Sequence, residues 1–132
     1  MKSLKAMACA VCVAMAAGLL QGCVLLVAGG AAAGTVSYVD NELHATVEVR
    51  FEKAWVAANA ALKSLKMPVT SSNKDAAYGK LESRNAQDQP VVIQVTRKSE
   101  GVTQVRVRVG TFSTAANKAG AQLVYDHMKA RF

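Results

Sequence analysis

Charged side chains are missing from a long stretch near the start of this sequence. Residues 6–39 contain no Asp, Glu, Lys or Arg, whereas Lys2 and Lys5 precede the stretch. A basic start followed by an apolar run is typical of a secretory leader, which ends at small residues. This pattern predicts that the rest of the chain is exported, and it excludes roles confined to the cytoplasm.

Cysteine and histidine are scarce as well. The three cysteines, Cys9, Cys12 and Cys23, all lie in the first 23 residues, and the whole chain has two histidines. These counts exclude a zinc site of the Cys/His type in the C-terminal part. They also exclude a disulfide there, although an oxidising compartment would permit one. We therefore expect no metal and no bound cofactor.

A short motif, Leu20-Gln21-Gly22-Cys23, closes the apolar run. Its position predicts the processing site of a bacterial lipoprotein, with residues 1–22 as the signal peptide and cleavage between Gly22 and Cys23. The Cys23 thiol would then carry diacylglycerol, and its freed amine would carry a further acyl chain. Two or more chains hold a protein firmly, because each buried methylene contributes about 0.8 kcal/mol. Val24 at the next position favours the outer membrane, facing the periplasm.

Two other interpretations of this region stay open. An ordinary secretory leader would leave Cys23 as a free thiol. An uncleaved anchor is the other alternative, because about 20 apolar residues suffice to span a bilayer. Five glycines between residues 18 and 34 disfavour a helix there, although membrane helices tolerate glycine. Both alternatives still place the C-terminal part outside the cytoplasm.

Cleavage would leave 110 residues, enough for one domain, with 14 basic and 9 acidic side chains. Residues 23–36 are rich in Ala and Gly, and we expect a lipidated tether at the headgroup surface. The spacing of Gly30 and Gly34 leaves insertion into the bilayer open, since small residues four apart let membrane helices approach closely. Residues 37–132 are expected to form a single α+β domain.

The pattern after the tether predicts strands and two amphipathic helices. Apolar and polar side chains alternate in each expected strand, and the helices repeat apolar residues at spacings of three and four. Pro68 ends the first helix, because the residue before a proline avoids helical backbone angles. We expect strands at residues 43–50, 69–72, 78–84, 91–97 and 102–109, and helices at residues 51–66 and 114–131.

Connections of hairpin length between the later strands make the expected sheet antiparallel. We therefore predict a two-layer α+β fold in the order β-α-β-β-β-α, with an antiparallel sheet of four to five strands. Two helices would pack on one face of this sheet, in a helix-grip-like arrangement. In the last helix, the expected buried side comprises Ala116, Gly120, Leu123 and either Val124 or His127.

Five short motifs follow one another along the chain. They read Gly34-Thr35-Val36-x-Tyr38, Glu42-Leu43, Trp55-x-Ala57, Ser71-Ser72-x-Lys74-Asp75 and Val107-Arg108-Val109-Gly110-Thr111-Phe112. In order and spacing they resemble a domain-of-unknown-function family of small bacterial lipoproteins, over about residues 20–130. The resemblance implies a lipid-anchored envelope protein and supplies no catalytic residue.

Side chains suited to catalysis are few. His44 is expected on the polar face of its strand, where Glu42 or Glu48 can bring a carboxylate near. His127 follows Asp126 on a helix, and adjacent helical residues point in different directions. For both histidines a structural role is the simpler interpretation. No nucleophile with its base is recognisable, so we do not expect an enzyme.

Basic side chains are expected on the sheet face that points away from the helices: Lys80, Arg84, Arg106 and Arg108. One interpretation is a surface for anionic partners such as lipid headgroups, lipopolysaccharide phosphates, peptidoglycan acids or an acidic protein. The other is a solvated face that keeps the sheet soluble. Nucleic acid is not expected as a partner, because the chain is exported and no exposed aromatic platform accompanies the arginines.

A cavity between the first helix and the sheet is the basis of a second functional hypothesis. Phe51, Trp55 and Leu62 would line it, and the alternative is that they form the core. The sequence thus predicts a non-enzymatic, lipid-anchored envelope protein that acts by interaction. Its expected partners are the membrane and an envelope protein or anionic envelope component. The alternative function is a membrane-anchored carrier of a lipid or another apolar ligand.

Overall fold

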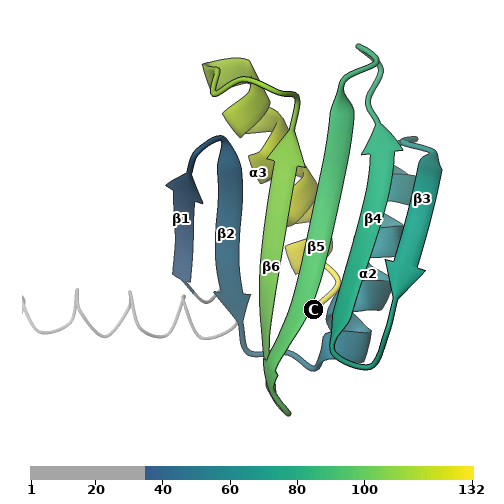
Figure 1. Ribbon diagram of the computed structural model, residues 1–132, viewed down its shortest axis with the longest axis vertical. Coiled ribbons are helices and arrows are strands. Elements are labelled where there is room, and N and C mark those ends of the chain that lie inside the picture. The colour runs from purple at the N-terminus through teal and green to yellow at the C-terminus, as the bar shows by residue number, and fades with distance from the viewer. Residues whose placement is uncertain (1–34) are drawn as a thin grey trace, which may run out of the picture. The chain divides into compact units, whose positions relative to one another are not determined.

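The computed structural model describes residues 35–132, which form one six-stranded antiparallel sheet and two helices (Figure 1). The strands are β1 (Thr35–Val39), β2 (Glu42–Val47), β3 (Val69–Lys74), β4 (Tyr78–Arg84), β5 (Pro90–Ser99) and β6 (Val102–Val109), and the helices are α2 (Phe51–Ser64) and α3 (Ala115–Lys129). The expected α+β class and antiparallel sheet are confirmed. The expected leader, the expected cleavage site at Gly22 and Cys23, and most of the expected tether lie outside the described residues.

Strand order across the sheet is β1-β2-β6-β5-β4-β3. The strands from β3 to β6 are neighbours in the order in which they follow along the chain, as hairpins require. β2 instead pairs with β6, the last strand in sequence. β5 and β6 therefore occupy the centre of the sheet, and β1 and β3 form its edges.

β1 is the strand that the sequence pattern missed, so the expected count of four to five strands was too low. It pairs with β2 over its whole length. The turn between them consists of Asp40 and Asn41, with φ of 47° and 70°. Two successive left-handed residues form a tight hairpin turn whose twist suits the flanking strands. Thr35 and Val36, which the sequence pattern assigns to the tether, therefore belong to the sheet.

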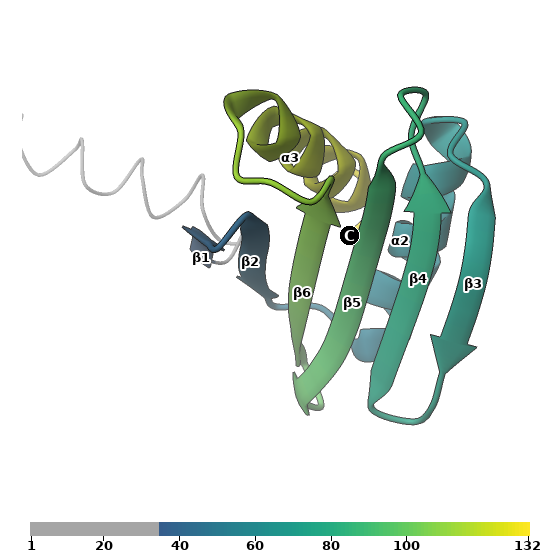
Figure 2. The ribbon, with the colours of Figure 1, turned by 45° about the horizontal axis from the view of Figure 1, so that its top comes forward.

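The hydrophobic core lies between the sheet and the helices. Figures 1 and 2 show both helices behind the sheet, where α2 contacts β4, β5 and β6, and α3 contacts β2 and β6. Alternate residues of the inner strands point to this side, because the pleat of a strand sends successive side chains to opposite faces. The buried sheet residues are Leu43, Ala45, Val47, Leu81, Val91, Ile93, Val95, Val105, Val107 and Val109.

α2 approaches the sheet closely because its buried face consists mostly of alanine. Ala54, Ala57, Ala58 and Ala61 are each at most 1% exposed. The larger Trp55 is half-buried and lies against the backbone of β4. A Cβ atom placed on Gly79 would lie 2.4 Å from the indole Cζ3, so a glycine at this position makes room for the ring.

The buried side of α3 differs from the one expected. Its buried residues are Asn117, Ala121, Val124, Tyr125 and Met128, so only Val124 was predicted correctly. Ala116 and Leu123 are exposed, and Gly120 and His127 are half-buried. The face is turned because a polar residue, Asn117, takes a buried position where its side chain finds hydrogen-bond partners.

The described residues carry a complete core of their own. Its members run from Leu43 to Met128, and all belong to the compact unit Ala32–Phe132. We therefore expect residues 35–132 to fold without the residues that precede them. Within this part of the chain, neither helix is long and apolar enough to cross a membrane.

Substituting Gly79→Ala should destabilise the fragment 35–132 by about 1–3 kcal/mol, the usual effect of overpacking. The added methyl group would meet the Trp55 ring. Thermal and urea unfolding followed by circular dichroism measure the change, and the unsubstituted fragment should unfold in one cooperative transition. Gly101→Ala is the control, because a Cβ there has no neighbour within 4 Å. Equal stabilities of the two variants would contradict the packing of Trp55 on β4.

Candidate functional site

The sheet surface turned away from α2 and α3 is here named the open face. Both helices of the described part lie behind the sheet in Figure 2, so the open face has no second layer of these residues over it. Strand pairing arranges its side chains in rows across the sheet. One row contains His44, Arg106, Gln94, Lys80 and Asn73, and the next contains Val39, Glu42, Arg108, Val92, Glu82 and Ser71.

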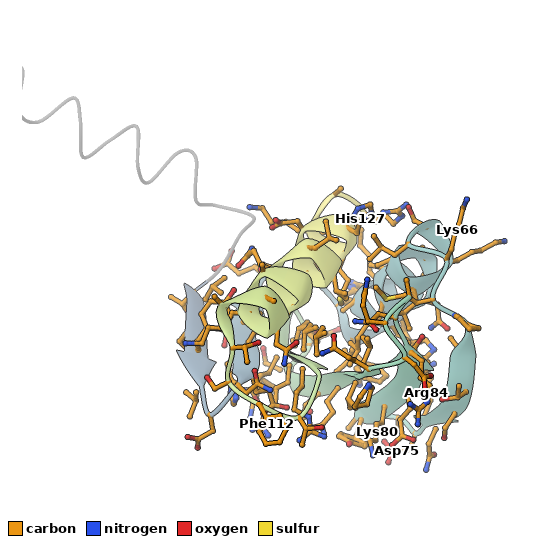
Figure 3. All side chains as sticks on the ribbon, turned by 90° about the horizontal axis from the view of Figure 1, so that it is seen from above. Lys66, Asp75, Lys80, Arg84, Phe112 and His127 are labelled. Atoms are coloured by element: carbon orange, nitrogen blue, oxygen red, sulfur yellow. The ribbon has the colours of Figure 1, made fainter. Side chains whose placement is uncertain are left out.

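The four basic residues predicted for this surface do share it. Arg106 and Arg108 belong to β6, and Lys80 and Arg84 belong to β4, which is separated from β6 by β5 alone. Their common direction follows from the two-residue repeat of a strand, since the alternate residues Leu81, Ser83 and Val107 are buried toward the helices. Figure 3 shows Lys80 and Arg84 on one side of the fold and Lys66 on the opposite, helical side.

The carboxylates of the open face already have partners. Glu42 Oε2 lies 3.0 Å from His44 Nε2, and Glu82 Oε1 lies 2.5 Å from Lys80 Nζ. At the end of β4, Arg84 Nη1 lies 3.4 Å from a carboxylate oxygen of Asp88. These pairs lie near the surface, where an ion pair contributes only about 0–1 kcal/mol. Their main effect is to occupy the acidic groups of this face.

Arg106 and Arg108 form no ion pair or hydrogen bond through their side chains with any residue between 35 and 132. The Nε atom of Arg106 is buried without an acceptor. An unpaired buried donor costs about 1–3 kcal/mol. Because Arg106 is half-buried as a whole, its remaining guanidinium nitrogens reach solvent. An acceptor supplied by a ligand would stabilise this side chain.

Lys80 and Arg108 belong to one electrostatic cluster. The pKa of Lys80 is raised above its usual value, first by its hydrogen bond to Glu82 and next by the charge of that carboxylate. The charge of Arg108 acts in the opposite direction and lowers the pKa. Lys80 is therefore charged at neutral pH, and it lies close enough to Arg108 for the two cations to repel each other.

A groove of about 700 Å³ opens elsewhere, where the end of α2, the β4–β5 loop and the first half of α3 meet. Its lining is largely apolar and includes Leu65, Met67, Val109, Phe112, Gly120 and Leu123. The four basic residues of the open face do not line it. The groove is therefore a second and separate surface feature.

The three residues expected to line an apolar cavity do not line this groove. Phe51 and Leu62 are 1% and 0% exposed and belong to the core, and Trp55 packs on Gly79. Phe51 also lines a smaller hollow of about 200 Å³, beside the guanidinium of Arg97, which lies 5.6 Å from the ring centre. The structure does not bring the three side chains together around one cavity of ligand size.

Asn117, which the sequence analysis missed, fixes the loop between β6 and α3. It is 5% exposed. Its Nδ2 donates to the Phe112 carbonyl at 2.8 Å, and its Oδ1 accepts from Gln89 Nε2 at 3.2 Å. Thr114 Oγ1 accepts from the Asn117 backbone N–H at 3.1 Å and so caps α3. Gly110, at φ 70°, leaves room for the Asn117 amide.

The loop held by Asn117 presents Phe112, which is 75% exposed. Figure 3 shows Phe112 on the side of the fold where Lys80 and Arg84 lie. An exposed phenyl ring therefore stands at the end of β6, beyond Arg108. The sequence did not show which way this loop turns, so the exposure of this single aromatic residue was not predicted.

The two histidines have different surroundings. His44 pairs with Glu42 on the open face, and His127 Nδ1 lies 3.4 Å from Ser64 Oγ, which joins α3 to α2. The carboxylate next to His127, that of Asp126, accepts a hydrogen bond from Gln122 at 2.8 Å. In the described part of the chain, no group of three or more His, Cys, Asp or Glu side chains is placed to hold a metal.

Substituting Glu82→Gln should lower the pKa of Lys80 toward its usual value, because the hydrogen bond to a charged carboxylate is lost. Arg108→Gln should raise it, because a repelling charge is lost. NMR titration of the lysine side chains measures both, and Glu48→Gln is the control. Since the folded pKa is raised, Lys80 stabilises the fold below its unfolded pKa, and this contribution disappears as pH rises through the folded pKa. Shifts of the same sign in both variants would contradict the cluster.

The comparisons with known proteins extend over nearly the whole chain. The profile of a family described as "Protein of unknown function (DUF3568)" matches residues 5–120. No curated protein matches the chain. The expected resemblance to a family of unknown function is thereby confirmed, while the lipoprotein anchor stays a prediction. The chain belongs to the DUF3568 family of proteins of unknown function.

Proposed function

We propose that this chain is a lipid-anchored bacterial envelope protein that acts by binding an anionic partner through its open face. Cys23 would carry the acyl chains and hold the domain at the outer membrane, facing the periplasm. No catalytic step is part of this proposal. The tether would keep residues 35–132 near the membrane, where a partner meets the basic side chains of the sheet.

The observation that carries this proposal is the pair of unpaired arginines on β6. Arg106 and Arg108 extend from a central strand, and the nearby carboxylates Glu42 and Glu82 are engaged by other side chains. If Arg106 served only to keep the protein soluble, an acceptor for its buried Nε atom would make the fold more stable, yet the fold supplies none. An anionic partner supplies the missing acceptors through charge-assisted hydrogen bonds, which are about twice as strong as neutral ones.

A solvated face remains the competing explanation for the basic residues, and one feature argues against it. Val92 lies between Arg108 and Glu82 in its row and is only 8% exposed. Neighbouring side chains of the open face therefore cover Val92 and are packed against the sheet. A side chain that is already packed loses less conformational entropy when it binds than a freely solvated one, and this favours recognition.

A carrier of a lipid or another apolar ligand is the second candidate function, and the groove supports it. Its volume of about 700 Å³ falls within the range of small-molecule sites. Leu65, Met67 and Leu123 supply apolar walls in place of the residues predicted from the sequence. Native mass spectrometry of the full chain tests this function, which requires a copurifying apolar ligand.

Crosslinking in the native envelope tests the proposed function. A photoreactive residue at Gln94, which lies beside Arg106 in its row, should crosslink to a discrete partner in cells that express the full chain. The double substitution Arg106→Glu and Arg108→Glu should reduce this adduct at least about tenfold, since two attractive contacts become repulsive. Intact-mass analysis of the same sample distinguishes an acylated Cys23 from an unmodified chain that starts at Met1.

Two matched controls accompany the crosslinking experiment. Lys63→Glu with Lys66→Glu makes the same change in net charge on the helical side, where both residues are exposed, and should leave the adduct unchanged. A photoreactive residue at Val56, which is 65% exposed on α2, should not give the adduct. If both charge variants lose the adduct, the net charge of the protein alone explains the loss, and this result would contradict a binding site on the open face.

A further inference from the structure

We infer that the open face binds the phosphate groups of a lipid surface, with Arg106 and Arg108 as phosphate ligands and with Phe112 and Val39 in the apolar layer beside them. This inference rests on the proposed function, because it takes the open face as the binding surface. It goes further in naming the chemistry of the partner.

Phosphate fits the two arginines better than a lone carboxylate does. They are two residues apart on one strand and point to the same face, so their two planar, positively charged guanidinium groups lie side by side. A phosphate monoester carries a charge of about −1.5 to −2 at neutral pH and offers three acceptor oxygens. It can accept from both guanidinium groups at once, which a carboxylate with two oxygens and one charge does less well.

The flanking residues complete a polar site around Arg106. Strand pairing places His44 on one side and Gln94 on the other, with Lys80 beyond Gln94 in the same row. The Gln94 amide and the Lys80 ammonium are further donors for phosphate oxygens. A phosphate oxygen bound at this site would supply the acceptor that the buried Nε of Arg106 lacks.

Apolar residues at one end of the open face indicate a lipid surface as the source of the phosphate. Phe112 is 75% exposed and Val39 is 50% exposed. Val39 stands in the same row as Arg108, with Glu42 between them, and Phe112 follows Arg108 by four residues. Cations next to exposed apolar side chains match the headgroup and acyl layers of a membrane surface. A soluble phosphate compound would leave Phe112 and Val39 in water.

The shape of the open face agrees with a planar partner. Neither the groove nor the two smaller hollows of residues 35–132 include Arg106, Arg108 or Lys80, and of the proposed binding residues only Phe112 also lines the groove. Small molecules bind mostly in concave sites that bury them. A broad sheet surface that presents several cations is better suited to a headgroup layer.

Vesicle binding of the fragment 35–132 tests this inference without the lipid anchor. The fragment should sediment with phosphatidylcholine vesicles that contain phosphatidic acid, and not with phosphatidylcholine alone. Substituting both arginines by glutamine should weaken this binding about thirtyfold, from the usual contribution of two basic side chains at a membrane. Phe112→Ser should weaken it about tenfold through lost apolar burial. Lys63→Gln with Lys66→Gln, an equal loss of charge on the helical side, should leave it unchanged.

A conservative variant and a soluble anion sharpen the result. Arg106→Lys with Arg108→Lys keeps both charges, and weaker binding would support phosphate recognition by the guanidinium forks. Binding equal to the unsubstituted fragment would overturn the assignment of the arginines as phosphate ligands. Inorganic phosphate is added in a parallel NMR experiment on the arginine Nε–H signals. If it shifts the Arg106 and Arg108 signals while vesicles do not bind, the source is a soluble phosphate and the lipid surface is excluded.

The outcome also separates this inference from the proposed function. If the fragment does not distinguish vesicles with and without phosphatidic acid, the inference fails. The arginine-dependent adduct at Gln94 would then still support an anionic partner of another kind. If that adduct is absent as well, the open face is not a binding surface and both fail.

Discussion

The two-residue repeat of β6 is the constraint on which the rest of the structure depends. Its valines at alternate positions complete the core under the helices, and the pleat then sends Gln104, Arg106 and Arg108 to the opposite face. Pairing with β2 and β5 fixes the neighbours of each arginine. The same pleat of β6 thus determines both the packing of its valines in the core and the positions of its two arginines. A shift of the strand by one residue would change both.

Because β6 places Arg106 and Arg108 on the open face, their positive charges have no acidic partner among residues 35–132. Most local choices in the domain are consistent with one another, such as the alanine face of α2 and the glycine under Trp55. The unpaired Nε of Arg106 is an exception, and exceptions of this kind tend to occur at functional sites. The loop held by Asn117 connects the two candidate surfaces, because Phe112 lines the groove and lies on the side of the open face.

Strong periodicity made much of the fold predictable. The alternation of valine with arginine in β6 correctly predicted that Arg106 and Arg108 point away from the core. The helix that ends before Pro68, α2, lies where the spacing of its apolar residues predicted it. The first hairpin could not be predicted from alternation, because Asp40 and Asn41 form its turn with unusual backbone angles. The buried face of α3 depends on Asn117, a polar residue buried for its hydrogen bonds. Burial of a polar side chain depends on partners distant in sequence, and hydrophobic spacing carries no information about them.

Hydroxyl-radical footprinting of the full chain in bacterial cells that express it tests most directly whether the open face is covered by a partner. The reference is the purified fragment 35–132. We expect Phe112, and Tyr78, which precedes Lys80 by two residues on β4 and so shares its face, to be less oxidised in the cells than in the fragment. Val56 and Leu123, exposed on the helices, should be oxidised equally in both. Equal oxidation of Phe112 and Tyr78 in the two samples, or protection of the helical pair instead, would contradict a binding role for the open face.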